Sequence, residues 1–287
     1  MLTRAQIQRL AQRQHIGLQV QERDYIQHLL LLALTNRSQA LVFKGGTALR
    51  LVYRGNRFSE DLDFNAAAGA DSPASVAALR ALWQQVVEDL AAFGVPAELR
   101  NPWEGEAGYS LDVSYQGPLY DGRDRSKGKV RVDVSRRFEP VETRRELVRS
   151  EYDDVRPFVV TVLTPEHLLA EKVRALLVRA KPRDLYDVWL LLSQGVALEP
   201  ALLQRKLALY DLPLTTATLE PALARAAADW ERDLRPLLPQ YVEPAVALRA
   251  VETLQALVHR PSPAAQGAVL DRSTSPAPAQ RRTPGQA

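Results

Sequence analysis

The stretch KGGTALRLVYRGNRFSEDLDF, residues 44–64, places a glycine pair and two aspartates within one predicted strand–helix–strand unit. The apolar run Ala40–Lys44 predicts a buried strand, and the residues after Gly45 and Gly46 predict a helix. Glycine lets the backbone approach a ligand closely, and the N-terminus of a helix favours phosphate, to which the hydroxyl of Thr47 can add. The alternative is an ordinary turn between a strand and a helix.

The end of this stretch, RFSEDLDF, alternates polar and apolar residues and therefore predicts a second strand. Alternate side chains of a strand share a face, so Asp61 and Asp63 point the same way as Ser59, and the apolar residues point the other way. Two adjacent carboxylates repel each other unless a cation lies between them, and Mg²⁺ prefers such oxygen ligands. The alternative is a solvated strand face neutralised by Arg54 or Arg57.

A third carboxylate lies in KVRVDVSRR, residues 129–137, which also alternates. Asp133 falls on its polar face, and it can join the two aspartates if this strand pairs beside theirs. Three carboxylates can hold two metal ions for in-line phosphoryl chemistry. The alternative for Asp133 is a salt bridge to Arg131 or to a neighbour.

Two further charged residues stand out in helices of the second half. Lys172 lies within the apolar arc of the helix that Thr164 and Pro165 begin, and a lysine is rarely buried without a partner. Asp187 lies near the start of the next helix, which is apolar almost all round. An antiparallel helix pair can bring the two together, either as a buried ion pair without chemistry or facing an anion in a cleft.

The composition is that of an ordinary globular protein, with 287 residues, 46% hydrophobic and 25% charged. The absence of cysteine excludes a disulfide scaffold and a cysteine-based metal site. The start of the chain lacks the apolar core of a signal peptide, and the apolar run Leu29–Leu34 is far too short to span a bilayer. We therefore expect a soluble, cytoplasmic protein with no membrane partner.

The pattern along the chain predicts an α+β fold with three parts. Residues 1–163 are expected to form N-terminal helices and an α/β core, residues 164–260 a helical domain, and residues 261–287 a disordered tail. The expected helices of the first part are Thr3–Gln14, Gln19–Thr35 and Pro73–Phe93, the last capped by Ser72. The further expected strands are Val95–Arg100, Tyr109–Tyr115, Lys129–Arg137 and Phe158–Leu163.

Together these pieces resemble a known family, the AbiEii/AbiGii-type nucleotidyltransferase toxins, which include the MenT toxins. KGGTALRLVY followed by RFSEDLDF is similar to the first motif of that family, and EKVRAL with RDLYDVWLL (Glu171–Leu191) is similar to its later motifs. The resemblance covers residues 25–195 and extends loosely to His259. It implies a DNA polymerase β-like nucleotidyltransferase core, a mixed sheet flanked by helices, followed by a helical bundle.

The resemblance also implies roles for individual residues. It implies a nucleotide-binding set of Lys44, Gly45, Gly46, Thr47, Ser59 and Lys172. It implies metal ligands at Asp61, Asp63 and, with the weakest surrounding motif, Asp133. It implies a catalytic set of Asp61, Asp63, Asp133, Lys172 and Asp187.

The activity implied by the resemblance is that of a toxin restrained by a cognate antitoxin. Two Mg²⁺ ions and an NTP would serve transfer of a nucleoside monophosphate to an RNA acceptor, the tRNA 3′ end. Residues 122–150 carry ten Lys or Arg and five Asp or Glu, which suits RNA docking, although solvated strand edges have the same composition. The alternatives are nucleotidyl transfer to a protein or small molecule, and a catalytically inert nucleotide- or RNA-binding regulatory module.

Overall fold

The computed structural model describes residues 1–66, 75–137, 139–251, 254 and 256. The predicted disordered tail and the predicted helix start at Ser72 and Pro73 lie outside these residues. Within them, no helix has the length and apolar character needed to cross a membrane.

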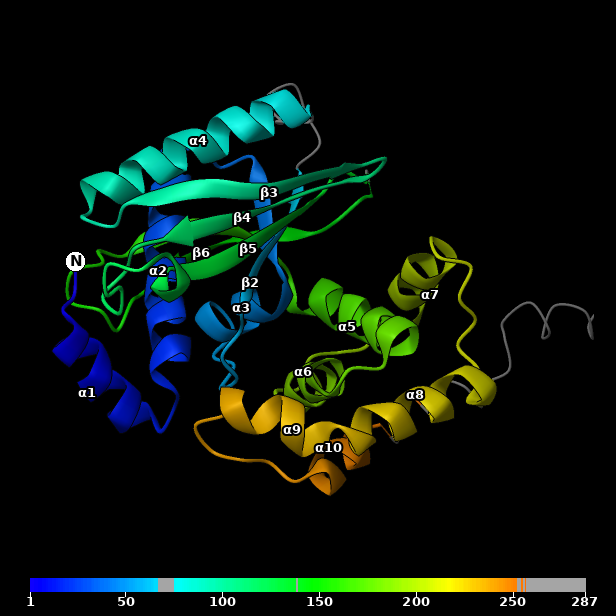
Figure 1. Cartoon of the computed structure of the whole chain (residues 1–287). Coiled ribbons are helices and arrows are strands. Elements are labelled where there is room, and N and C mark those ends of the chain that lie inside the picture. The colour runs from blue at the N-terminus through cyan, green and yellow to red at the C-terminus, as the bar shows by residue number, and fades with distance from the viewer. Residues whose placement is uncertain (67–74, 138, 252–253, 255, 257–287) are drawn as a thin grey trace, which may run out of the picture.

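A mixed sheet forms the centre of the molecule (Figure 1). In the part of the chain that the structure describes it has seven strands, in the order β3-β4-β5-β2-β1-β7-β6. Their bounds are β1 Leu41–Lys44, β2 Asp61–Ala66, β3 Ala97–Gly105, β4 Gly108–Tyr115, β5 Gly128–Ser135, β6 Thr143–Val148 and β7 Phe158–Leu163. The β2–β5 and β1–β7 pairs are parallel, and the other neighbours are antiparallel.

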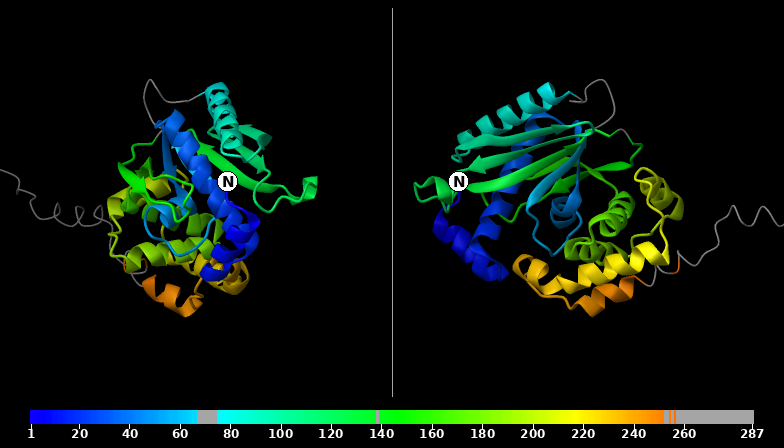
Figure 2. Two further views of the ribbon diagram at one scale, coloured as in Figure 1. Left: turned by 90° about the vertical axis from the view of Figure 1, so that its left-hand side faces the viewer. Right: turned by 45° about the vertical axis from the view of Figure 1, so that its right-hand side comes forward.

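Helices cover both faces of the sheet (Figure 2). In the first half they are α1 Arg4–Gln14, α2 Leu18–Arg37, α3 Gly45–Leu51 and α4 Val76–Ala92. In the second half they are α5 Pro165–Arg179, α6 Pro182–Ser193, α7 Pro200–Ala208, α8 Thr216–Ala228, α9 Trp230–Leu234 and α10 Pro244–Ala250. This architecture confirms the predicted α+β fold of a sheet flanked by helices.

Two apolar cores lie on the two sides of the sheet. Leu62 and Phe64 of β2 are buried in the core that α2 and α4 share with the sheet. Val42 of β1 and Leu49 of α3 are buried in the other core, with the apolar side chains of α5 to α10. Because Leu62 and Phe64 point to the first core, the alternating Asp61 and Asp63 point to the side of the second.

The structure corrects two details of the predicted strands. The segment before Asp61 is not part of β2: the Phe58 N–H donates to the Leu237 carbonyl, and Arg57 bonds to Asp187, so tertiary contacts hold this segment as a loop. The strand β6 was not predicted, because TRRELV is mostly charged and lies at the edge of the sheet, where a strand needs no apolar run.

Candidate active site

A row of residues in register crosses three strands and defines the site. Lys44 at the end of β1 is paired with Asp63 of β2, and Asp63 is paired with Asp133 of β5. Residues directly opposite each other on neighbouring strands project to the same face of a sheet. The row therefore brings one ammonium and two carboxylates together, and Asp61 lies two residues before Asp63 on the same face. The pairing of β5 beside the β2 aspartates, which the sequence left open, is thus present in the structure.

The glycine pair is required by close contacts with this row. Gly45 has φ +77°, and a Cβ there would lie 2.0 Å from Oδ2 of Asp63. A Cβ on Gly46 would lie 2.5 Å from Nη2 of Arg57 and 2.8 Å from Oγ of Ser59. Only glycine at both positions lets the start of α3 lie against β2 and the loop before it. The pair thus has a packing role whether or not a phosphate binds there.

Thr47 and Ser59 lie at the same junction, both buried. The Thr47 hydroxyl donates to the backbone carbonyl of Asp61, which fixes the first residue of β2 against α3. Nucleotide contacts by these two hydroxyls stay a prediction.

Burial and mutual repulsion raise the pKa values of the β2 aspartates. Burial is the main cause that raises the pKa of Asp63 to about 6; Asp61 and Asp133 add to the rise, while Lys172 and Lys44 oppose it. Burial also raises the pKa of Asp61, with further contributions from Glu60 and Asp133. The carboxylates are close enough to disfavour one another's charge, which a bound cation would reverse.

Asp133 forms the predicted ion pair with Arg131 and also lies beside Asp63. It faces Asp63 in register, and its Oδ2 also accepts a hydrogen bond of 3.2 Å from Nε of Arg131. Arg131 donates in turn to the Ser110 hydroxyl. Among the described residues, no group of three or more His, Cys, Asp or Glu side chains is gathered as a metal site. Asp61 and Asp63 are the better-placed candidate ligands, and the role of Asp133 stays a prediction.

Lys172 and Asp187 meet, as the antiparallel helix pair predicted. Lys172 Nζ lies 2.7 Å from Oδ2 of Asp187, and Arg57 bonds to both oxygens of the same carboxylate at 3.1 and 2.9 Å. Asp187 is 1% exposed. Burial favours a higher pKa for Asp187, but Arg57 and Lys172 lower it below its usual range. Asp187 therefore holds two cations in place, and its predicted catalytic role stays a prediction.

Lys172 also lines a pocket of about 140 Å³ beside the carboxylates. Gly45, Asp63 and Arg179 line the same pocket, with Lys44 at its edge. The glycine turn, a β2 carboxylate and the cationic helix α5 therefore share one cleft, as the sequence motifs predicted.

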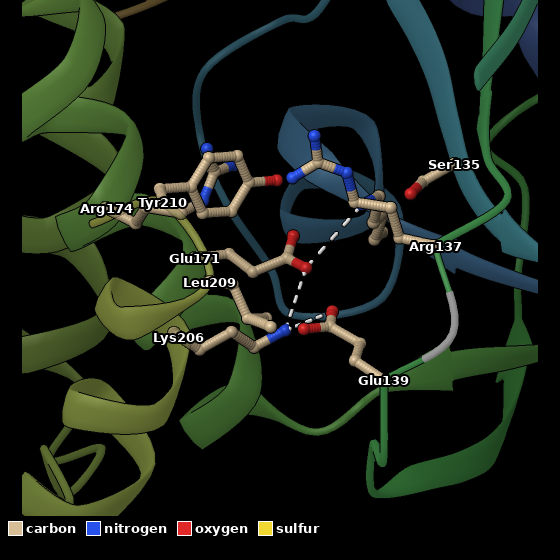
Figure 3. A pocket seen from close by; sticks show the side chains of 9 residues that line it. Ser135, Arg137, Glu139, Glu171, Arg174, Lys206, Leu209 and Tyr210 are labelled. Carbon is tan, nitrogen blue, oxygen red and sulfur yellow. Dashed lines mark hydrogen bonds and ion pairs between the residues drawn. The ribbon is translucent and has the colours of Figure 1, made fainter. Parts of the chain in front are cut away.

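A second, larger pocket of about 380 Å³ adjoins the first (Figure 3). Its floor is a chain of ion pairs in which Lys206 bonds to Glu139 and Glu171, and Glu171 lies 3.6 Å from Lys44. Although burial acts to raise it, Lys44 and Lys206 lower the pKa of Glu171 to about 2. The charge of Lys44 is thus partly balanced from within the protein.

Comparisons with known proteins agree with this geometry. Residues 29–257 match the model of the family described as nucleotidyl transferase AbiEii toxin, type IV TA system. The chain belongs to the AbiEii nucleotidyltransferase toxin family. No curated protein is significantly similar to it.

Solved structures show the same fold as this AbiEii chain. The nucleotidyltransferase toxin MenT4 of Mycobacterium tuberculosis has 21% identity and a TM-score of 0.64, over 95% of this chain and 95% of that one. JHP933 of Helicobacter pylori has 19% identity and a TM-score of 0.55, over 89% of this chain and 98% of that one. The resemblance that the two motifs indicated is confirmed.

Two buried residues of this AbiEii site were not predicted from the sequence. Arg57 was considered only as a partner of the strand aspartates, but it binds Asp187, 130 positions away. Asp184 is fully buried, bonds to Arg179 through both oxygens, and lies 4.0 Å from Lys172. Asp184 could have been found from the sequence, because it shares a helix face with Asp187. Nothing in the sequence linked Arg57 to that helix.

Proposed function

We propose that this AbiEii-family chain transfers a nucleoside monophosphate from an NTP to RNA, with the tRNA 3′ end as acceptor. The reaction would require Mg²⁺, and a cognate antitoxin would restrain it. One observation carries the proposal: Asp63 lines one cleft with Gly45 and Lys172, and Asp61 lies two residues before it on the same face of the sheet.

The residues present fit a divalent metal ion. Asp61 and Asp63 offer the hard oxygen ligands that Mg²⁺ prefers; burial, and to a lesser extent neighbouring carboxylates, raise their pKa values, and a bound cation would favour their charged forms. Asp133 faces them and could supply a further oxygen. When bound, Mg²⁺ would neutralise and polarise the phosphates of the nucleotide.

The other residues would bind and orient the reactants. Lys172 would offset negative charge on the departing pyrophosphate, and Asp187, itself fixed by Arg57, would hold the Lys172 ammonium at the cleft. The acceptor hydroxyl oxygen would form a bond to the α-phosphorus while the bond from that phosphorus to the β-phosphate oxygen breaks. Asp133, with 42% of its side chain exposed, would accept the hydroxyl proton.

An RNA acceptor is supported by the charge around the cleft. Residues 122–150, which include β5, carry twice as many basic as acidic residues, ten against five. The choice of tRNA follows from the resemblance to the MenT-type toxins.

Incubation of the purified protein with each α-labelled NTP, Mg²⁺ and total RNA tests the proposal. We expect label in RNA of tRNA size, lost with EDTA and with Asp61→Asn. Label on protein or on a small molecule would instead support the alternative acceptors. No label on any acceptor, with each of the four NTPs, would contradict nucleotidyl transfer.

The toxin assignment has a cellular test. Expression is expected to arrest growth, and Asp61→Ala or Lys172→Ala is expected to relieve the arrest at equal protein level. Arrest that persists in both variants would contradict toxicity by this site.

A further inference from the structure

A groove continues from Asp133 away from the nucleotide cleft. A hollow of about 460 Å³ is lined by Asp133, Ser135 and Arg137 on one side, with Trp103 and Tyr210 at its borders. Ser135, Arg137 and Tyr210 also line the pocket of Figure 3, so the hollow and the pocket form one continuous groove. We call this the Trp103–Tyr210 groove.

The register of the sheet places Trp103 on the face of the carboxylates. Trp103 of β3 is paired with Ser110 of β4, which is paired with Asp133 of β5. Trp103 is therefore two strand spacings from Asp133, about 10 Å at roughly 4.8 Å per strand. The row that begins at Lys44 thus ends in an aromatic side chain.

The Trp103 side chain is open to solvent. It is 58% exposed, so its ring adds little to the core. A Cβ on Gly105 would lie 2.3 Å from its Cη2, and one on Gly108 would lie 3.3 Å from its Cζ3. The two glycines of the β3–β4 hairpin therefore leave room for the indole to lie against the turn.

Tyr210 of the groove packs against two arginines. Tyr210 follows α7, is 38% exposed, and has Arg137 and Arg174 within 4.8 and 4.4 Å of its ring centroid. Figure 3 shows Arg137 reaching across the pocket toward Tyr210. Within the described part of the chain, neither arginine forms an ion pair, whereas the neighbouring Glu139 is already neutralised by Lys206. Two guanidinium groups beside a partly exposed ring suit a ligand that has both anionic groups and flat rings.

We propose that the Trp103–Tyr210 groove binds the single-stranded hydroxyl end of a nucleic-acid acceptor, a site that rests on the proposed function. Unpaired bases stack on Trp103 and contact the edge of Tyr210, whose ring packs against the two guanidinium groups, and Arg137 contacts phosphate. The span of about 10 Å between Trp103 and Asp133 accommodates about three stacked nucleotides at roughly 3.4 Å each. The terminal hydroxyl then reaches Asp133, where its oxygen bonds to the α-phosphorus, its proton passes to the carboxylate and pyrophosphate leaves. A duplex end presents no unpaired base to these rings, so the groove selects single strands.

Equilibrium binding of a fluorescent twelve-nucleotide oligoribonucleotide tests the groove without any transfer reaction. The full chain carries Asp61→Asn in all samples, and no NTP is present. We expect Trp103→Ala and Tyr210→Ala each to weaken binding at least about fivefold, and Trp103→Phe to retain most of it. Arg137→Gln is expected to lower the slope of log affinity against log salt concentration by about 1.

Leu147→Ala is the matched control. Leu147 is also a large exposed apolar residue, 49% exposed, but it lies on β6 at the opposite edge of the sheet. Its replacement is expected to leave the affinity unchanged, and thermal melts verify that all variants fold. Equal affinity in the Asp61→Asn parent and in its Trp103→Ala and Tyr210→Ala derivatives would overturn the proposal, as would equal binding of a blunt duplex of the same sequence.

The KM for RNA separates this proposal from the proposed function. If the wild type labels RNA and Trp103→Ala raises the KM for RNA but not for NTP, the groove is supported. If Trp103→Ala leaves both KM values unchanged, the groove is overturned while nucleotidyl transfer to RNA stands. If only protein is labelled, the proposal that the groove is an acceptor site is overturned. If no RNA is labelled but oligonucleotide binding still depends on Trp103, the groove is supported and the proposed activity is contradicted.

Discussion

At the scale of single residues, both the backbone conformation at position 45 and the contact with Asp63 require a glycine there. Its φ of +77° is unfavourable for any residue with a Cβ, and Asp63 occupies the space that a Cβ would need. Gly195 has a similar φ of +81°, but a Cβ at that position would meet nothing within 4 Å. Replacing Gly195 therefore measures the cost of the left-handed backbone conformation alone, whereas replacing Gly45 adds the cost of the contact with Asp63.

We predict that Gly195→Ala lowers the free energy of unfolding by about 1–2 kcal/mol, the cost of a left-handed residue. Gly45→Ala is expected to cost clearly more and to abolish nucleotidyl transfer, because Asp63 must move. Chemical denaturation and the transfer assay measure the two effects. Equal losses in both variants would show that Asp63 does not constrain this position.

The cluster of Arg57, Lys172 and Asp187 gives a second prediction at this scale. Arg57→Met should destabilise the protein more than Lys172→Met, because Arg57 makes two of the three bonds to the buried Asp187. Lys172→Met should nevertheless abolish transfer while keeping most of the stability, since Asp187 retains its two bonds to Arg57. Denaturation curves and initial rates for both variants check this. Equal stability losses, or an active Lys172→Met protein, would contradict the division of roles.

At the scale of secondary-structure elements, much of the fold was predictable because apolar alternation is a local signal. The strand Phe158–Leu163 was predicted with its observed bounds, and α1 and α2 within about two residues. The edge strand β6 was not predicted, because its charged residues carry no such signal. The strand β3 continues past its predicted end through Pro102 to Gly105, with an irregular register after Arg100. Local rules end a strand at that proline, but an edge strand tolerates it.

The site was predictable to the extent that it depends on local spacing. The shared face of Asp61 and Asp63 followed from strand alternation alone. The pairing of Asp63 with Asp133 depended on which strands are neighbours, which the sequence left open. The bonds of Arg57 to Asp187 join a loop to a helix, and no spacing rule connects them.

Glu171 links three elements, since it pairs with Lys44 of β1 and Lys206 of α7. Its pKa of about 2 is below the usual value of 4.5, so its stabilising effect is complete above pH 4.5 and lost as the pH falls toward 2. We predict that Glu171→Gln lowers the free energy of unfolding at pH 7 by about 3 kcal/mol. The difference from wild type should shrink between pH 4.5 and 2.

Glu220→Gln, on the exposed side of α8, is the control for this series and should have little effect at either pH. Denaturation of the three proteins across the pH range measures the differences. A stability difference for Glu171→Gln that is independent of pH would show that charge at this position does not matter.

At the scale of the whole molecule, the site lies on the side of the sheet that faces the second core, and both halves of the chain contribute to it. Asp61 and Asp63 come from the sheet, Lys172 and Asp187 from helices of the second half, and Arg57 from the connecting loop. Val42 and Leu49 of the first half pack in the second core, so the two parts share a large contact. The predicted division between residues 163 and 164 stays a prediction.

Metal binding should therefore stabilise the entire fold in a pH-dependent way. With its pKa near 6, Asp63 carries a proton below that pH in the metal-free protein and must release it to bind a cation. We predict that Mg²⁺ raises the Tm more at pH 7.5 than at pH 5, and that Asp63→Asn removes the difference. Melting curves with Mg²⁺ or EDTA at both pH values check this. A larger Tm increase at pH 5 would contradict the proposed role of Asp63.

The most direct test of the central claim compares two positions of the label in the same NTP. With RNA as acceptor, the protein is incubated with α-labelled or γ-labelled NTP. The Asp61→Asn variant is assayed in parallel, after its Tm has been shown to equal that of the wild type. The account predicts that RNA gains label from the α-phosphate only, that the γ-label appears in pyrophosphate, and that Asp61→Asn does neither. Transfer of the γ-label to RNA, or full activity of Asp61→Asn, would contradict nucleotidyl transfer at this site.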